Sequence, residues 1–131
     1  MARKIFILGG GQSALYAARE IRRNDEESFI TVLGEEKQLP YERPPLSKDF
    51  LLNKKNEQDL VFNSSNVLED KKIDYVNAKI IKVDFETKTL FSDDTKKYNY
   101  DILLIATGSE NNKLKLESNL DDEIYYLRNL E

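Results

Sequence analysis

A glycine-rich string near the amino terminus has the spacing of a dinucleotide-binding turn. Residues 9–14 read Gly-Gly-Gly-Gln-Ser-Ala and fit the pattern G-x-G-x-x-A. In such a turn Gly9 permits the tight exit from a strand, Gly11 lets a pyrophosphate approach the main chain, and Ala14 lets the helix pack closely on the sheet. The N–H groups and dipole at the start of that helix then bind the phosphates. The pattern predicts a dinucleotide site but does not distinguish FAD from NAD.

Acidic residues follow this motif at the distance expected for ribose binding. Glu35 stands 21 residues after Ala14, and Glu36 is the next residue. In dinucleotide sites an acid about 20 residues beyond the glycines accepts hydrogen bonds from ribose hydroxyls. A glycine turn without any ligand is the alternative interpretation. The acid at this distance and the elements that flank the turn favour dinucleotide binding.

The glycine turn needs a strand before it and a helix after it. Residues 4–8 are short and rich in Ile and Phe, which predicts a buried strand. Residues 13–23 carry an apolar face and an opposite charged face, which predicts a helix. Residues 29–33 predict a second strand. Strand, turn, helix and strand form a βαβ unit, whose two strands pair in parallel through a right-handed crossover.

The rest of the chain predicts more strands. Residues 101–106 are a continuous apolar run typical of a central parallel strand, and residues 73–76 predict another strand. Three segments between them, 78–85, 87–92 and 97–100, predict an antiparallel meander. We therefore expect an α/β fold: a Rossmann-like βαβ unit with a parallel sheet and an antiparallel β-meander. Less regular elements are expected as a helix from Leu46 to about Leu52, a polar connector at 54–66, a short helix at 66–71 and a short strand at 124–127.

Two further segments carry candidate site residues. Residues 39–48 contain all three prolines, which stiffen a loop holding Arg43 and Lys48. Without further evidence, the simplest interpretation is that Arg43 and Lys48 are solvated charges and that the prolines only cap a helix. The second segment is Ala106-Thr107-Gly108, which follows the apolar run at 101–106. Ligands of open α/β sheets bind at the carboxyl ends of strands, so this segment is expected beside the dinucleotide.

Composition excludes several kinds of chemistry. The 131 residues are expected to form one domain and include no His and no Cys, so His-based triads, thiolate nucleophiles and Cys-ligated clusters are excluded. We expect no metal-binding site in this sequence. A net charge of −4 argues against a nucleic-acid or membrane-surface binder. With no membrane span or signal peptide expected, the sequence indicates a cytoplasmic protein.

Several motifs together resemble one family. These are I-x-x-x-G-G-G-x-x-A at 5–14, I-T-V-L-G-E-E at 30–36, P-Y-x-R-P-P-L-S-K at 40–48, Y-D-x-L-L-I-A-T-G at 100–108 and Y-L-R-N-L at 126–130. Their order and spacing resemble the amino-terminal part of FAD-dependent NAD(P)H reductases of ferredoxins and rubredoxins, which include the apoptosis-inducing-factor group. This is the pyridine nucleotide-disulfide oxidoreductase superfamily. The proline-rich string is the most specific of these motifs.

The resemblance implies a role for each matching residue. Arg43 and Lys48 would reach toward the flavin and its linking chain, and Lys48 would lie near the isoalloxazine, where a positive charge stabilises the reduced flavin. Glu35 would bind the adenosine ribose, with Glu36 beside it, and the main chain of Ile80 would meet the adenine. The remaining implied FAD contacts are Gly9, Gly10, Gly11, Ser13, Ala14, Ala106, Thr107, Gly108 and Arg128.

The implied reaction is hydride transfer from NAD(P)H to FAD, followed by single-electron transfer to a ferredoxin- or rubredoxin-type iron–sulfur protein. The family's FAD domain is built in two pieces around an NAD(P) domain, and residues 1–131 match the first piece. We therefore expect an incomplete FAD domain that is inactive alone and lacks the last strand of its sheet. One expected partner is a complementary subunit that supplies the NAD(P) domain. The alternative is a non-catalytic Rossmann module that senses NAD or an adenine nucleotide.

Overall fold

Four parallel strands form the central sheet of the protein. The computed structural model describes residues 1–61, 68–69, 72–114 and 124–130. The strands are β1 (Lys4–Leu8), β2 (Phe29–Gly34), β3 (Ile73–Asn77) and β7 (Ile102–Ile105), arranged in the order β3-β2-β1-β7. All three neighbouring pairs are parallel. The predicted α/β class and the predicted strands of this sheet are confirmed.

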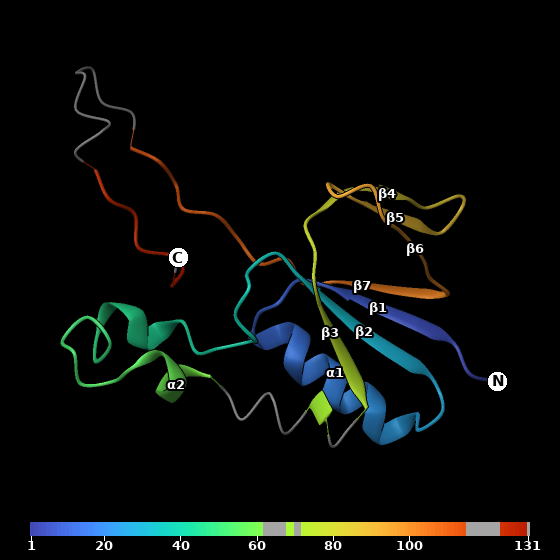
Figure 1. Cartoon of the computed structure of the whole chain (residues 1–131), viewed down its shortest axis with the longest axis horizontal. Helices are drawn as coiled ribbons and strands as arrows, with labels where there is room; N and C mark the ends of the chain where they lie inside the picture. The colour runs from blue at the N-terminus through green and yellow to red at the C-terminus, as the bar shows by residue number, and fades with distance from the viewer. Residues whose placement is uncertain (62–67, 70–71, 115–123, 131) are drawn as a thin grey trace.

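Helix α1 (Gln12–Asn24) joins β1 to β2 and covers one face of the sheet (Figure 1). Alternation along β1 and β2 turns Ile5, Ile7, Ile30 and Val32 toward this helix, where they pack with its buried side chains. The apolar face predicted for residues 13–23 is the face that is buried. Burying a side chain of this size stabilises the fold by about 1.5–3 kcal/mol, so this cluster fixes the helix against the sheet.

The other face of the sheet carries the predicted meander. Strands β4 (Ile80–Asp84), β5 (Thr89–Ser92) and β6 (Lys97–Asn99) pair antiparallel in that order. A second core lies between the two sheets and is centred on Leu33, Leu90 and Tyr100. The structure thus has three layers, with α1 and the meander on opposite faces of the parallel sheet (Figure 1).

The proline-rich segment and the residues that follow it, up to 61, form a small unit beside the sheet. It contains the 3₁₀ helix η1 (Pro44–Ser47) and the short helix α2 (Glu57–Leu60), whose Asn56 side chain accepts a hydrogen bond from the Asp59 N–H in a capping box. Tyr41, Leu46 and Leu60 form its core. An isolated bridge joins Tyr41 to Val61.

Two helix predictions are corrected here. The helix expected from Leu46 to about Leu52 is instead η1 followed by turns, because Lys48 has φ −130° and ψ −110° and takes the chain out of a helical path. The polar connector expected at 54–66 contains α2, whose Asn-based capping box compensates for its short length. Of the helix expected at 66–71, residues 68–69 are helical and the others lie outside the described residues.

Two strand predictions are also corrected. The strand expected at 124–127 is absent: these residues have no ladder partner in the described part of the chain, and Tyr125 is 93% exposed. The run at 101–106 does form a parallel strand, but β7 pairs with β1 alone and lies at an edge of the described sheet. Helix α1 lies over β1 and β2 and leaves Ile102 and Leu104 partly exposed. An apolar run identifies a strand but does not give its position in the sheet.

Candidate dinucleotide-binding site

The predicted site segments meet at one edge of the parallel sheet. Register places Leu8 beside Leu33 and Ile105, so the residues that follow β1, β2 and β7 leave the sheet on the same side. Strands β2 and β3 lie on one side of β1, and β7 lies on its other side. This reversal of strand order is a topological switch point, where open α/β sheets bind their ligands. The glycine turn and Ala106 lie on either side of it.

Gly9 makes the close approach between β1 and β7. Its φ is +124°, and a β-carbon on it would stand 2.1 Å from the carbonyl oxygen of Ala106. The Gly9 N–H donates to the Leu33 carbonyl at 2.8 Å, and the Ala106 N–H donates to the Leu8 carbonyl at 2.7 Å. Only glycine fits both this conformation and this contact.

Gly11 and the start of α1 form an open cradle. Apart from its chain neighbours, a β-carbon on Gly11 would meet no atom of the described residues within 4 Å. Gly11 is also the N-cap of α1, and neither a capping side chain nor an acid in the first turn occupies the helix start. Ser13 is exposed there, whereas Ala14 is fully buried against the sheet. The first N–H groups of α1 therefore remain available to an anion.

Gly10 and Gly34 make room for the side chain of Tyr75. A β-carbon would stand 2.8 Å from the Tyr75 hydroxyl at Gly10 and 2.0 Å from it at Gly34. The hydroxyl lies 3.0 Å from the Glu36 carbonyl and 3.1 Å from the Gln38 carbonyl. Burial raises the pKa of Tyr75 to about 12. Sequence reasoning missed Tyr75, although a glycine that ends a strand is a signal of close approach.

Glu35 and Glu36 have different surroundings. The Glu35 carboxylate is 66% exposed and pairs with the Lys79 ammonium at 2.8 Å, a contact that raises the pKa of Lys79. The Glu36 carboxylate is only 18% exposed and pairs with the Arg43 guanidinium. It also accepts a hydrogen bond from the Tyr41 hydroxyl at 2.5 Å. Glu35 therefore presents the more accessible carboxylate at the end of β2.

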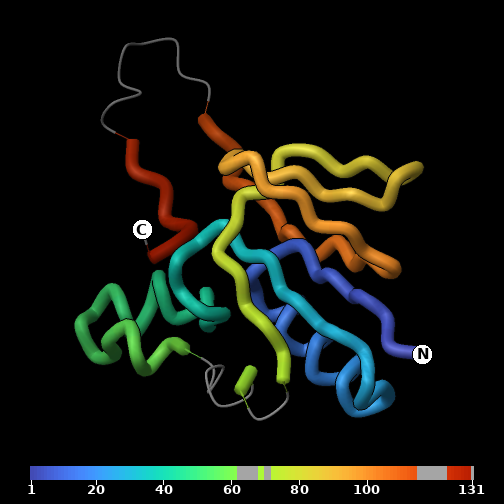
Figure 2. Tube along the Cα trace, turned by 45° about the vertical axis from the view of Figure 1, so that its right-hand side comes forward, coloured from blue at the N-terminus to red at the C-terminus, as the bar shows by residue number. Residues whose placement is uncertain are grey.

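Arg43 connects the proline-rich segment to the carboxyl-terminal residues. Its Nη1 donates to the Arg128 carbonyl at 3.0 Å and to Asn129 Oδ1 at 2.6 Å. Figure 2 shows the last described residues beside the loop that follows β2. Arg128 Nη2 donates to Ser109 Oγ at 3.3 Å, so this guanidinium lies next to the end of β7. The structure thus brings Arg43, Arg128 and Glu36 together.

The other predicted residues occupy three places, at the end of β7, the start of β4 and the end of η1. Thr107 and Gly108 are exposed after β7, and Ala106 packs against the α1-side core. Ile80 begins β4 and packs on the core between the sheets, one residue after Lys79. Lys48 is exposed at the end of η1, and its side chain makes no hydrogen bond or ion pair with the other predicted residues in the described part of the chain.

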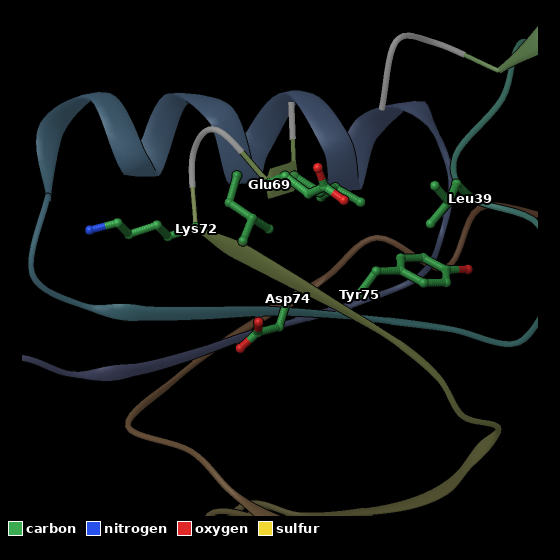
Figure 3. Close-up of a pocket in the computed structure, with 7 residues that line it drawn as sticks. Leu39, Glu69, Lys72, Asp74 and Tyr75 are labelled. Carbon is green, nitrogen blue, oxygen red and sulfur yellow. The ribbon is translucent and has the colours of Figure 1, made fainter. Parts of the chain in front are cut away.

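A separate hollow of about 500 Å³ lies beside β3 (Figure 3). Leu39, Leu68, Ile73 and Tyr75 supply its apolar lining, and Glu69, Lys72 and Asp74 supply charged groups. None of the predicted dinucleotide residues lines it. Among the described residues, no cluster of three or more metal-ligating side chains occurs, and no helix has the length and apolar character of a membrane span.

Comparison with known proteins agrees with this geometry. The family model described as pyridine nucleotide-disulphide oxidoreductase matches residues 3–131. The chain belongs to this family. The resemblance seen in the motifs is thereby confirmed.

Individual relatives match the chain along nearly its whole length. The ferredoxin–NAD(+) reductase component of the p-cumate 2,3-dioxygenase system of Pseudomonas putida is 33% identical over 98% of this chain and 32% of that protein. NADH:rubredoxin oxidoreductase from Clostridium acetobutylicum superposes with a TM-score of 0.74 and 28% identity, over 89% of this chain and 30% of that one. Putidaredoxin reductase, in its covalent complex with putidaredoxin, superposes with a TM-score of 0.85 over 99% of this chain and 32% of that one. At 23% identity the last match shows the fold alone. The chain spans about a third of the length of these relatives.

Proposed function

We propose that residues 1–131 are the amino-terminal portion of an FAD-binding domain. The protein would be part of an NAD(P)H-dependent flavoprotein oxidoreductase that passes electrons to a ferredoxin- or rubredoxin-type protein. The observation that carries the proposal is the open cradle at Gly11, located at the switch point between β1 and β7. Membership of the reductase family supports FAD over NAD as the dinucleotide.

The residues at this edge fit an adenine dinucleotide. A β-carbon on Gly11 would meet none of the described residues beyond its chain neighbours within 4 Å, which leaves space for a pyrophosphate at the main chain. The uncapped start of α1 offers N–H groups and the positive end of a helix dipole to that pyrophosphate. Glu35 offers an exposed carboxylate to ribose hydroxyls. These three features bind the dinucleotide through the main chain and one acid.

The residues around the cradle then orient the bound group. Gly9, Gly10, Ser13 and Ala14 would hold the turn and helix start against the pyrophosphate, and the main chain of Ile80 would meet the adenine. Ala106, Thr107 and Gly108 would lie beside the cofactor at the end of β7. Arg128, next to Ser109, would add a positive charge there. Lys48 is exposed and would approach the flavin end from η1.

When bound, FAD would supply the chemistry that a chain without His or Cys lacks: it takes a hydride from NAD(P)H and releases electrons singly. The protein's residues would bind and orient it. We further propose a cytoplasmic location, because NAD(P)H is an intracellular reductant.

A Gly11→Ala variant tests the proposal directly. The added methyl would occupy the cradle without touching protein atoms, so the chain folds while FAD affinity falls at least about tenfold. Gln12→Ala is the matched control, because Gln12 is exposed in the same helical turn and has no assigned role. FAD binding is measured by flavin fluorescence or by the heat of titration, and NAD binding is measured separately by heat.

The outcomes separate the two candidate ligands. Saturable FAD binding that Gly11→Ala weakens and Gln12→Ala preserves supports the proposal. Saturation by NAD with no response to FAD would favour the nucleotide-sensing module instead. Binding of neither dinucleotide to the folded chain would overturn the assignment of the site.

A further inference from the structure

The main chain of Glu36 is fixed to strand β3. Its carbonyl oxygen accepts hydrogen bonds from Asn77 Nδ2 at 2.9 Å and from the Tyr75 hydroxyl at 3.0 Å. The same Asn77 amide also reaches the carbonyl oxygens of Gly34 and Glu35. The loop after β2 therefore has a defined path, and the Glu36 side chain leaves it from a fixed point.

Both carboxylate oxygens of Glu36 are engaged by the proline-rich segment. Oε2 accepts from the Tyr41 hydroxyl at 2.5 Å, and Oε1 accepts from Arg43 Nη2. The Arg43 guanidinium also lies 5.1 Å from the centre of the Tyr41 ring. Tyr41 is only 3% exposed, and the side chains of Glu36 and Arg43 are 18% and 29% exposed, so these contacts are partly shielded from water. Hydrogen bonds with a charged partner in such surroundings are stronger than neutral ones.

Tyr41 and Arg43 in turn hold the segment 128–130. The Tyr41 hydroxyl accepts from the Leu130 N–H at 3.2 Å, and Leu130 packs against the core around Tyr41. Arg43 Nη1 donates to the Arg128 carbonyl and to Asn129 Oδ1. One carboxylate therefore supports the two side chains that bind this segment.

Docking of 128–130 determines where the Arg128 side chain can reach. Arg128 Nη2 lies 3.3 Å from Ser109 Oγ and 3.5 Å from the position of a β-carbon on Gly108. Gly108 follows β7 at the carboxyl edge of the sheet. The guanidinium thus stands at the edge where the proposed function places the cofactor.

We propose that Glu36 is a positioning residue, which holds Tyr41 and Arg43 so that they dock residues 128–130 and place Arg128 at the dinucleotide site. Glu36 is then not a ribose ligand. Its oxygens already bind two side chains, whereas the neighbouring Glu35 has the exposed carboxylate that a ribose needs. Glu36 places Arg128 whether or not a nucleotide is bound. The contribution of Arg128 to FAD binding rests on the proposed function.

The docking is tested first without any nucleotide, by amide hydrogen exchange. Glu36→Gln should speed exchange of the Leu130 amide about tenfold or more, because the charged partner of Tyr41 and Arg43 is lost. Amides of β1 should keep their protection, since the effect is local. Glu42→Gln is the matched control, because Glu42 lies between Tyr41 and Arg43 in sequence and its side chain makes none of these contacts. An unchanged Leu130 amide in folded Glu36→Gln would overturn the proposal.

A spectroscopic signature reports on the same contact. Burial and the hydrogen bond to Glu36 raise the pKa of Tyr41 to about 12, with Arg43 acting in the opposite direction. Glu36→Gln should lower the pKa of Tyr41, followed by NMR of ring-labelled tyrosine, and Glu42→Gln should leave it unchanged. If Glu36→Gln fails to fold, Tyr41→Phe serves instead: it removes the hydroxyl bound to Leu130 and should release the same amide.

The final measurement links docking to the cofactor. Glu36→Gln and Arg128→Ala should each weaken FAD binding about five- to tenfold, and the double variant should be at most about twofold weaker than the worse single variant. Additive losses would mean that Glu36 contacts FAD independently and would overturn the proposal. If the wild-type chain binds no FAD, the proposed function fails, while the exchange and tyrosine measurements still decide the role of Glu36.

Discussion

The carbonyl oxygen of Ala106 lies 2.1 Å from the place where Gly9 would carry a β-carbon. This contact joins the end of β7 to the end of β1, which are nearly 100 residues apart in the chain. It closes the sheet edge at the switch point and leaves the cradle at Gly11 open beside it. Two glycines of one motif therefore have different roles: Gly9 allows the main chain of Ala106 to pack closely, whereas Gly11 leaves the helix start open to a ligand.

Replacing Gly9 by alanine should destabilise the fold strongly. Both the φ of +124° and the clash with Ala106 oppose a β-carbon, so the free energy of unfolding should fall by about 3 kcal/mol or more. Gly11→Ala, which has space and a φ of −95°, should cost less than about 1 kcal/mol. Urea unfolding followed by circular dichroism measures both. Equal losses in the two variants would contradict this division of tasks.

Gly34 is predicted to require its small size because of Tyr75. Gly34→Ala places a β-carbon 2.0 Å from the Tyr75 hydroxyl, so we expect a loss of about 2 kcal/mol in the free energy of unfolding. Tyr75→Val removes the ring and should cost a comparable amount on its own, because a half-buried side chain and its hydrogen bonds are lost.

The double variant distinguishes a clash from a backbone effect. In Gly34→Ala/Tyr75→Val the added methyl meets no ring, so its loss should be clearly smaller than the sum of the two single losses. Additive losses would place the cost of Gly34→Ala in the main chain rather than in contact with Tyr75.

The layers of the fold could be predicted because each has a local pattern. The apolar runs of β1 and β7, the glycines after β1 and the alternation in the meander all indicate element type from neighbouring residues. The edge position of β7 and the missing strand at 124–127 could not be predicted, because strand order and pairing depend on distant residues. The same local information suggested a helix after Leu46, where the main-chain angles of Lys48 prevent one.

The candidate site divides in the same way. Motif spacing is sufficient to bring Gly9, Gly11 and Ala106 to one edge, since parallel strands end together. Spacing could not distinguish Glu35 from Glu36, because they are adjacent and have the same chemistry. What separates them is their partners, Lys79 for Glu35 and Arg43 for Glu36, which the fold brings together from other segments.

Alkaline pH should destabilise the protein through Tyr41. Burial raises its pKa in the folded state to about 12 from 10.0, so the unfolded chain loses this proton first as pH rises. The stability it contributes is complete below pH 10 and is lost between about pH 10 and 12. Wild-type unfolding free energy should therefore fall more steeply across that range than that of Tyr41→Phe, measured by urea titration at each pH. Parallel curves for the two proteins would contradict the expectation.

Glu35→Gln should separate ligand binding from stability. The Glu35–Lys79 pair is 66% and 56% exposed, and such surface pairs contribute little to folding. We expect the free energy of unfolding to change by less than about 0.5 kcal/mol. Affinity for FAD should fall several-fold, because an amide replaces the carboxylate offered to the ribose hydroxyls. Urea unfolding and FAD titration of the same preparation measure the two effects, with Glu26→Gln, an exposed acid in the loop after α1, as control. A large loss of stability with unchanged FAD affinity would instead make Glu35 a structural residue.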